Sequence, residues 1–141
     1  MGKNDFKRFS TEARKVIKDL PRDMGKALLL ETSDNFRRQG YEDEEGHVHQ
    51  WAPRKGRRGR LGPPAGRQRA ILVQSGRLRR SPRNVAMTSN SVTVGTDVPY
   101  AQPLQEGADP HLPARPFIVV SKSLREKIAR NLTAKIKAAL R

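Results

Sequence analysis

The sequence predicts an α+β fold, in which a small antiparallel sheet packs against N-terminal helices and a long C-terminal helix, with a long basic loop. Three observations support this prediction. Apolar residues recur at helical spacing near both ends of the chain, apolar and polar residues alternate over 85–94, and glycine, proline and arginine dominate 54–69. The chain has 141 residues, so a single domain over 1–141 is expected.

Two helices are expected at the N-terminus. Apolar residues at helical spacing predict an amphipathic helix over residues 3–19. Pro21 suits the first turn of a second helix that runs to Arg38, and Gly40 suits the left-handed position that ends it. The side chains expected to be buried on this second helix are those of Met24, Ala27, Leu28 and Phe36.

A hairpin and two further strands are expected after the basic segment. The alternation over 85–94 is interrupted by Ser89 and Asn90, which suit a two-residue turn between antiparallel strands. Short apolar runs predict a third strand at 98–101 and a buried strand at 117–120. Together these strands would form the small sheet of the fold.

A long helix is expected at the C-terminus. It follows residues 102–116, whose four prolines predict irregular structure. Ser121 or Ser123 is the expected N-cap, and Ser123 with Glu126 fits a capping box. The helix carries an apolar stripe and is basic elsewhere. The residues of the stripe are Leu124, Ile128, Leu132, Ile136 and Leu140.

The net charge is +15, and most of it lies in one stretch. Residues 51–83 contain eleven Lys or Arg and no Asp or Glu. Because like charges repel and Gly and Pro disfavour regular structure, 54–69 is expected to be a mobile loop. Arginine clusters neutralise phosphates, so nucleic acid is one candidate partner, although no aromatic residue for base stacking lies between Arg54 and Arg83. An acidic protein surface would suit the same composition.

Several classes of function are excluded or disfavoured. The chain has no cysteine, which excludes disulfides, thiolate zinc sites and cysteine nucleophiles, and no run approaches the ~18 apolar residues of a membrane span. Residues 42–45 with His47 and His49 are interpreted as a solvated loop rather than a metal site, because adjacent carboxylates cannot converge without further ligands. His111 lies between prolines and indicates no Ser-His-Asp arrangement. We therefore expect neither an enzyme nor a bound metal or cofactor.

Short motifs occur in a distinctive order along residues 36–140. They are Trp51-Ala-Pro, a basic insertion, Ser75-Gly76-Arg-Leu78, Pro99-Tyr100-Ala101, Glu106-Gly107 and Arg115-Pro-Phe117. This series resembles the phage virion morphogenesis (tail completion) family, in which a tryptophan-proline element precedes a Ser/Thr-Gly-x-Leu motif. Two departures are that Leu104 stands where many members have histidine, and that the insertion is richer in arginine.

The resemblance implies a non-enzymatic virion protein that acts at the head–tail junction or in finishing the tail, as a tail terminator or connector does, after assembly in the host cytoplasm. It also implies a homo-oligomeric ring, commonly a hexamer, between neck or connector proteins and the tail tube, with DNA passing through the channel non-specifically. The alternative is a basic protein that binds DNA phosphates non-specifically; no membrane contact is expected. The residues expected to serve assembly or partner contact are Trp51, Arg57, Arg58, Arg60, Ser75, Gly76, Leu78, Tyr100, Gly107, Arg115 and Phe117.

Four of these residues carry more specific expectations. Tyr100 is expected either to anchor the end of a strand or to be a plain core tyrosine. Arg115 lies between two prolines in an extended segment, and is expected to pair with a carboxylate of the same fold in preference to one of the next subunit. Gly76 and Gly107 are expected to serve backbone geometry.

Overall fold

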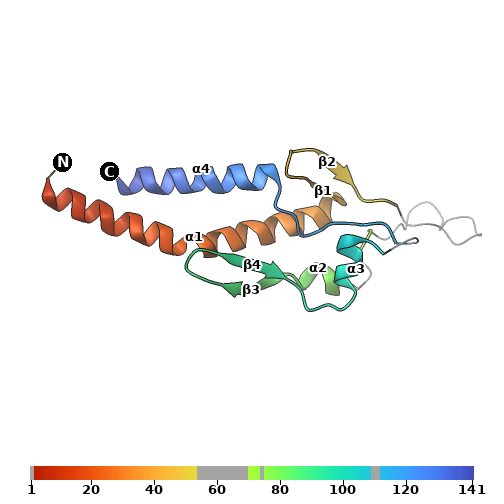
Figure 1. Cartoon of the computed structure of the whole chain (residues 1–141). Coiled ribbons are helices and arrows are strands. Elements are labelled where there is room, and N and C mark those ends of the chain that lie inside the picture. Colours follow the sequence, from red (N-terminus) through yellow and green to blue (C-terminus); the bar gives the residue numbers. More distant parts are fainter. Residues whose placement is uncertain (1, 54–69, 74, 109–111) are drawn as a thin grey trace, which may run out of the picture.

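The computed structural model describes residues 2–53, 70–73, 75–108 and 112–141, and the expected mobile loop at 54–69 lies outside these ranges. The fold is α+β, as expected. Two long helices lie side by side (Figure 1). Two small antiparallel sheets pack against the N-terminal one of them, and two short helices complete the fold. The elements are α1 (Lys3–Arg38), β1 (Gly40–Glu42), β2 (Val48–Gln50), α2 (Arg77–Arg80), β3 (Arg83–Met87), β4 (Val92–Gly95), α3 (Ala101–Glu106) and α4 (Lys122–Ala139).

Residues 3–38 form one helix, so the expected break before Pro21 is wrong. Pro21 lies inside α1, where proline removes one backbone hydrogen bond and favours a bend. Figure 1 shows the axis of α1 changing direction in its middle. The helix ends at Gln39, whose φ of 58° is left-handed, and not at Gly40. Gly40 instead pairs in β1, where a side chain would collide with the backbone carbonyl of His49.

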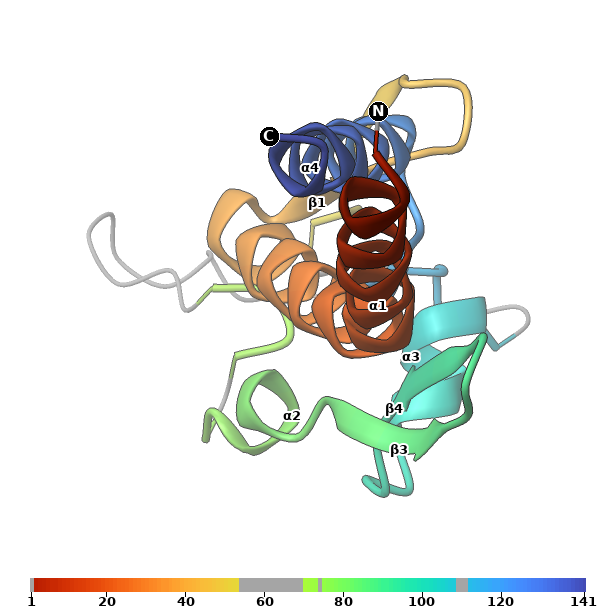
Figure 2. The ribbon, with the colours of Figure 1, turned by 90° about the vertical axis from the view of Figure 1, so that its left-hand side faces the viewer.

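The expected hairpin is confirmed as β3 and β4, which pair antiparallel. The amide of Thr88 donates to the carbonyl of Ser91 at 2.9 Å and so closes the two-residue turn between them. The hairpin packs against α1, on the side opposite to α4 (Figure 2). At this contact the position of Gly25 faces Asn84, and a Cβ there would lie 2.6 Å from the Asn84 Oδ1.

Two predicted strands are wrong, and one pair of strands was not predicted. Residues 98–101 lead into α3 through a turn in which the Ala101 amide donates to the Val98 carbonyl at 3.1 Å. Residues 117–120 belong to none of the strands in the described part of the chain. β1 and β2 include residues 42 and 49, which belong to the segment interpreted as a solvated loop. Two three-residue strands carry too weak an apolar pattern to be recognised in the sequence.

Residues 117–118, in the connection before α4, form hydrogen bonds with side chains rather than with a neighbouring strand. Gln105 Oε1 accepts from the amides of Phe117 at 2.9 Å and Ile118 at 3.1 Å, and its Nε2 donates to the Ile118 carbonyl at 2.9 Å. Asn35 Nδ2 donates to the Phe117 carbonyl at 3.0 Å. The backbone groups that a sheet would have satisfied are therefore satisfied by amide side chains from α3 and α1.

The N-terminus of α4 is tied to the rest of the fold by two serines. Ser121 is the N-cap, as one of the two expectations had it: its Oγ accepts from the amide of Leu124 at 3.0 Å and donates to Glu31 Oε1 at 3.1 Å. The capping box expected at Ser123 is wrong. The amide and hydroxyl of Ser123 both donate to Glu42 Oε1, at 2.9 and 2.8 Å.

The hydrophobic core lies where the C-terminal end of α1 meets α2 and α3. It is formed by Phe36, Trp51, Leu78, Val98, Ala101 and Phe117. Of the side chains expected to be buried on the second half of α1, only Phe36 is buried, and Met24, Ala27 and Leu28 are half-buried. The stripe on α4 is confirmed in part, because it grades from buried Leu124 to exposed Leu140 as the helix leaves the core.

Candidate assembly site

Five of the residues predicted to serve assembly line one hollow, with a volume of about 490 Å³. Three separate segments of the chain meet there. We call it the α2–α3 hollow, after the short helices beside it. Its lining consists of Ile71, Leu72, Ser75, Gly76, Arg77, Leu78, Tyr100, Leu104 and Arg115. The fold thus brings together motif residues that are far apart in the sequence.

Local backbone geometry shapes one wall of the α2–α3 hollow. Gly76 has a φ of 78° and caps α2, and Ser75 Oγ accepts from the Arg77 amide at 3.3 Å. One turn of helix then buries Leu78 in the core while the arginines of α2 stay exposed. The positive φ supports the expectation that Gly76 serves backbone geometry. The arginines that α2 presents are Arg77, Arg79 and Arg80.

Arg115 is buried, with 7% of its surface exposed, and it contacts the two residues that follow Trp51 in the sequence. Its Nε donates to the Ala52 carbonyl at 2.9 Å, and its Nη2 lies 3.3 Å from the Pro53 carbonyl. Its amide donates to the carbonyl of Leu104 at 2.8 Å. These contacts fix the two residues that precede the segment 54–69. A carboxylate partner for Arg115 stays a prediction.

Trp51 and Phe117 support the α2–α3 hollow from the core and do not line it. Their exposed fractions are 4% and 1%. The Phe36 ring lies edge-on to Trp51 at 5.6 Å and tilted to Phe117 at 5.5 Å between centroids. Trp51 Nε1 donates to the Pro116 carbonyl at 2.8 Å. These two aromatic residues therefore fix the positions of the segments that carry Arg115.

Tyr100 has neither of the two expected roles. It is 44% exposed, so it is not a core tyrosine, and it precedes α3 rather than ending a strand. It stands at the rim of the α2–α3 hollow, and Leu104 lies in the lining one turn along. Leu104 therefore gives the lining an apolar side chain at this point.

Gly107 ends α3 in a conformation that only glycine adopts readily, with φ 84° and ψ 157°. A Cβ at this position would lie 2.9 Å from the Ala114 backbone nitrogen. This geometry supports the expectation that Gly107 serves backbone geometry. Sequence reasoning missed Gln105 and Asn35, which hold the neighbouring connection, because glutamine and asparagine in a single sequence carry no signal of burial.

The arginines Arg57, Arg58 and Arg60 lie outside the described residues. Their expected contact with a partner stays a prediction. Within the described part, Arg77, Arg79 and Arg80 on α2 and Arg83 at the start of β3 are exposed. Arg83 Nη2 lies 3.3 Å from Asp97 Oδ2, in an exposed ion pair. Of these exposed arginines, Arg77 lines the α2–α3 hollow, and the others follow it closely in the sequence.

The acidic turn between β1 and β2 is held by its own hydrogen bonds. Asp43 Oδ1 accepts from the amides of Glu45 at 3.0 Å and His47 at 2.8 Å, and Asp43 Oδ2 lies 2.7 Å from His49 Nε2. The hydrogen bond with His49 is the chief cause that lowers the pKa of Asp43 to about 2. Asp43, Glu45 and His47 are the described residues that could share a metal ion, with one ligand atom each within 4.8 Å of the others. The hydrogen bonds of Asp43 to the amides of Glu45 and His47 hold these residues close to one another.

Comparison with known proteins identifies one family. The model of the phage virion morphogenesis family matches residues 3–137. Neither the comparison with curated proteins nor that with solved structures gave a significant match. No helix among the described residues combines the length and the apolar character that crossing a membrane requires.

Proposed function

Because the chain belongs to the phage virion morphogenesis family, we propose that it is a ring subunit that completes the phage tail or joins the tail to the head. The match confirms the resemblance found in the sequence and covers α1, the α2–α3 hollow and all but the last two residues of α4. Membership indicates a structural protein of the virion that interacts with other virion components. The ring, its place in the particle and its partners belong to the proposal.

The α2–α3 hollow is the observation that supports an assembly role best. Motif residues from three segments meet at a surface with exposed Tyr100 at its rim and basic α2 beside it. Tyrosine and arginine are enriched where proteins bind one another, because both combine an apolar body with a polar end. We therefore propose that this hollow receives a neighbouring subunit or ring.

The basic charge supports a position close to the DNA channel or to acidic faces of other rings. The proposed partners are further copies of this chain, in a hexamer, with neck or connector and tail tube proteins above and below. DNA would pass through the ring and meet arginines without being read for sequence, because phosphate contacts carry no sequence information. No turnover is proposed, and the protein would act only as a component of the tail or head–tail junction.

A free nucleic-acid-binding protein is the second candidate. The exposed arginines of α2 favour it, since they are part of the basic stretch 51–83 and lie at the surface. Under this alternative the chain would hold DNA as a monomer, with an affinity that falls steeply as salt rises. A ring subunit would instead hold DNA weakly until it is assembled.

Electron microscopy of the purified chain, alone and mixed with tails from a phage that lacks the gene, tests the proposal. Rings, or particles that carry this protein at the tail end or junction, are the expected result. A phage that lacks the gene should release heads and tails that do not join, and the intact gene should restore joining. A monomer that never enters particles, or joining that is normal without the gene, would contradict the proposed function.

A further inference from the structure

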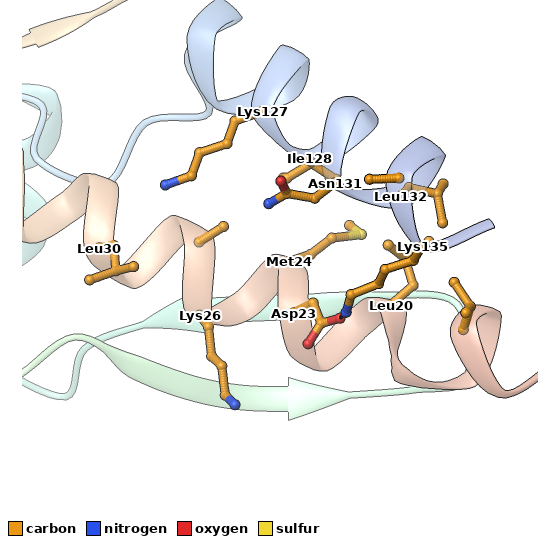
Figure 3. Close-up of a pocket in the computed structure, with 13 residues that line it drawn as sticks. Leu20, Asp23, Met24, Lys26, Leu30, Lys127, Ile128, Asn131, Leu132 and Lys135 are labelled. Carbon is orange, nitrogen blue, oxygen red and sulfur yellow. Dashed lines mark hydrogen bonds and ion pairs between the residues drawn. The ribbon is translucent and has the colours of Figure 1, made fainter. Parts of the chain in front are cut away.

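An apolar groove of about 440 Å³ runs between α1 and α4 and is separate from the α2–α3 hollow. Leu20 and Met24 of α1 face Ile128 and Leu132 of α4 across it, and Leu30 lies in the lining farther along α1 (Figure 3). Leu30 is a large apolar residue that lies away from both ends of α1, and 60% of its surface is exposed. Exposed apolar surface that is gathered in one groove is typical of a docking site rather than of a scattered surface residue.

Lysines surround this groove. Lys26 extends from α1, and Lys127 and Lys135 from α4, while Asp23 is the acidic residue in the lining. Asp23 is already paired with Lys135. Lys127 reaches from α4 toward the space between the two helices, whereas Lys26 extends from α1 on the side away from α4 (Figure 3). The groove therefore combines an apolar floor with a positive rim.

The charge of the two helices decides what can cover the groove. Residues 3–38 contain ten Lys or Arg against six Asp or Glu, and residues 122–139 contain six against one. Packing the same helices of a second copy into the groove would bring like charges together. The stretch 54–69 contains seven Lys or Arg and no Asp or Glu, so it suits the lysine rim no better. Charge complementarity favours a segment that is acidic and belongs to a different protein.

We propose that the groove between α1 and α4 binds an acidic amphipathic helix of another virion protein. The apolar face of that helix lies on the leucines and methionine of the floor, and its carboxylates lie beside Lys26 and Lys127. On α1 the lining runs from Val16 to Leu30. At 1.5 Å per residue this is about 21 Å, which is the length of a partner helix of roughly 14 residues. This inference rests on the proposed function, since it requires the protein to meet other virion components.

Photocross-linking in assembled particles tests who occupies the groove. A photoreactive phenylalanine analogue replaces the exposed Leu30, and the cross-linked peptides from purified particles are sequenced by mass spectrometry. The expected product joins Leu30's position to an acidic amphipathic helix of another virion protein. A product with a second copy of this chain, a product with a segment that is not acidic, or no product would overturn the proposal. If particles contain none of this protein, the proposed function fails instead.

Charge reversal then tests the lysine rim. The probe is a synthetic peptide of the cross-linked segment, and its binding to the full chain is followed by fluorescence anisotropy. Lys26→Glu with Lys127→Glu should weaken binding about tenfold or more, because two attractive contacts become repulsive. Lys18→Glu with Lys137→Glu changes the charge equally but lies outside the groove lining, and should change affinity less than about twofold. Equal losses for both pairs, or no loss for the first pair, would overturn the proposal.

Discussion

The guanidinium Nε of Arg115 donates a hydrogen bond to the backbone carbonyl of Ala52 at 2.9 Å, although 63 positions separate the two residues. This contact joins the connection before α4 to the segment that follows β2. Trp51, the residue before Ala52, donates a hydrogen bond from its indole nitrogen to the Pro116 carbonyl. Two hydrogen bonds, one donated from each segment, therefore fix residues 51–52 against residues 115–116, beside the α2–α3 hollow.

Replacing Arg115 with lysine should destabilise the fold by about 2 kcal/mol, because lysine cannot reproduce the planar fork that reaches two backbone carbonyls. The free energy of unfolding, measured by urea titration, checks this. Arg79→Lys is the matched control, since Arg79 is exposed on α2, and it should change stability by less than about 0.5 kcal/mol. Equal effects of the two substitutions would show that the Arg115 contacts are not structural.

Gln105→Ala should cost about 2–3 kcal/mol, because it leaves two amides and one carbonyl of residues 117–118 without their partner. Thermal unfolding of the full chain measures the loss. Gln102→Ala lies in the same helix but removes only a 3.4 Å exposed contact with Glu106, so it serves as control. An unfolding temperature as high for Gln105→Ala as for the control would contradict the prediction.

Gly107→Ala should destabilise by about 2 kcal/mol, because the φ of 84° is strained for any side chain and a Cβ would crowd Ala114. Gly95→Ala offers a matched comparison at a glycine of β4. A Cβ there meets only the Val85 methyl groups at 3.6 Å, which is an ordinary contact, so stability should change by less than about 0.5 kcal/mol. Denaturant midpoints that fall equally for both variants would exclude this explanation.

The carboxyl of Asp43 should titrate near pH 2, below its usual value of 3.8. A pKa lowered by folding stabilises the protein above the unfolded value, and that contribution is lost as the pH falls from about 4 through about 2. NMR titration of the Asp43 carboxyl carbon measures this pKa. His49→Ala removes the largest cause and should raise the midpoint, whereas a midpoint that does not move would refute the role of His49.

Replacing Arg57, Arg58 and Arg60 with glutamine should weaken joining of tails to heads, because the charge that meets acidic faces or channel DNA is reduced by three. Joining is counted from particles by electron microscopy, and DNA binding by the unassembled chain is measured by gel shift over a range of salt. Under the proposed function this DNA binding is weak and non-specific in the wild type. Tight binding by the monomer that the triple change abolishes, with joining intact, would favour the nucleic-acid-binding alternative.

Much of the candidate site could be named from the sequence, but its arrangement could not. The motif order pointed to Ser75, Leu78 and Tyr100, and the structure brings them to one hollow. The same motifs also included Trp51 and Phe117, which lie in the core. A motif shows that a residue matters to the family, whereas burial decides whether it acts through contact or through support.

The sequence by itself determined the elements whose signal is local. Apolar periodicity placed α4 and the helical residues of α1, and alternation placed the β3–β4 hairpin. For the start of α4 the sequence offered Ser121 and Ser123 as N-caps, and the structure selected Ser121. Only the tertiary structure decided that α1 continues through Pro21 and that residues 117–120 form no strand among the described elements. Both outcomes depend on distant partners: α1 is packed against α4 and β4, and Gln105 with Asn35 satisfies the backbone after Arg115. Such contacts outweigh local propensity because packing and buried hydrogen bonds act between residues that the sequence keeps far apart.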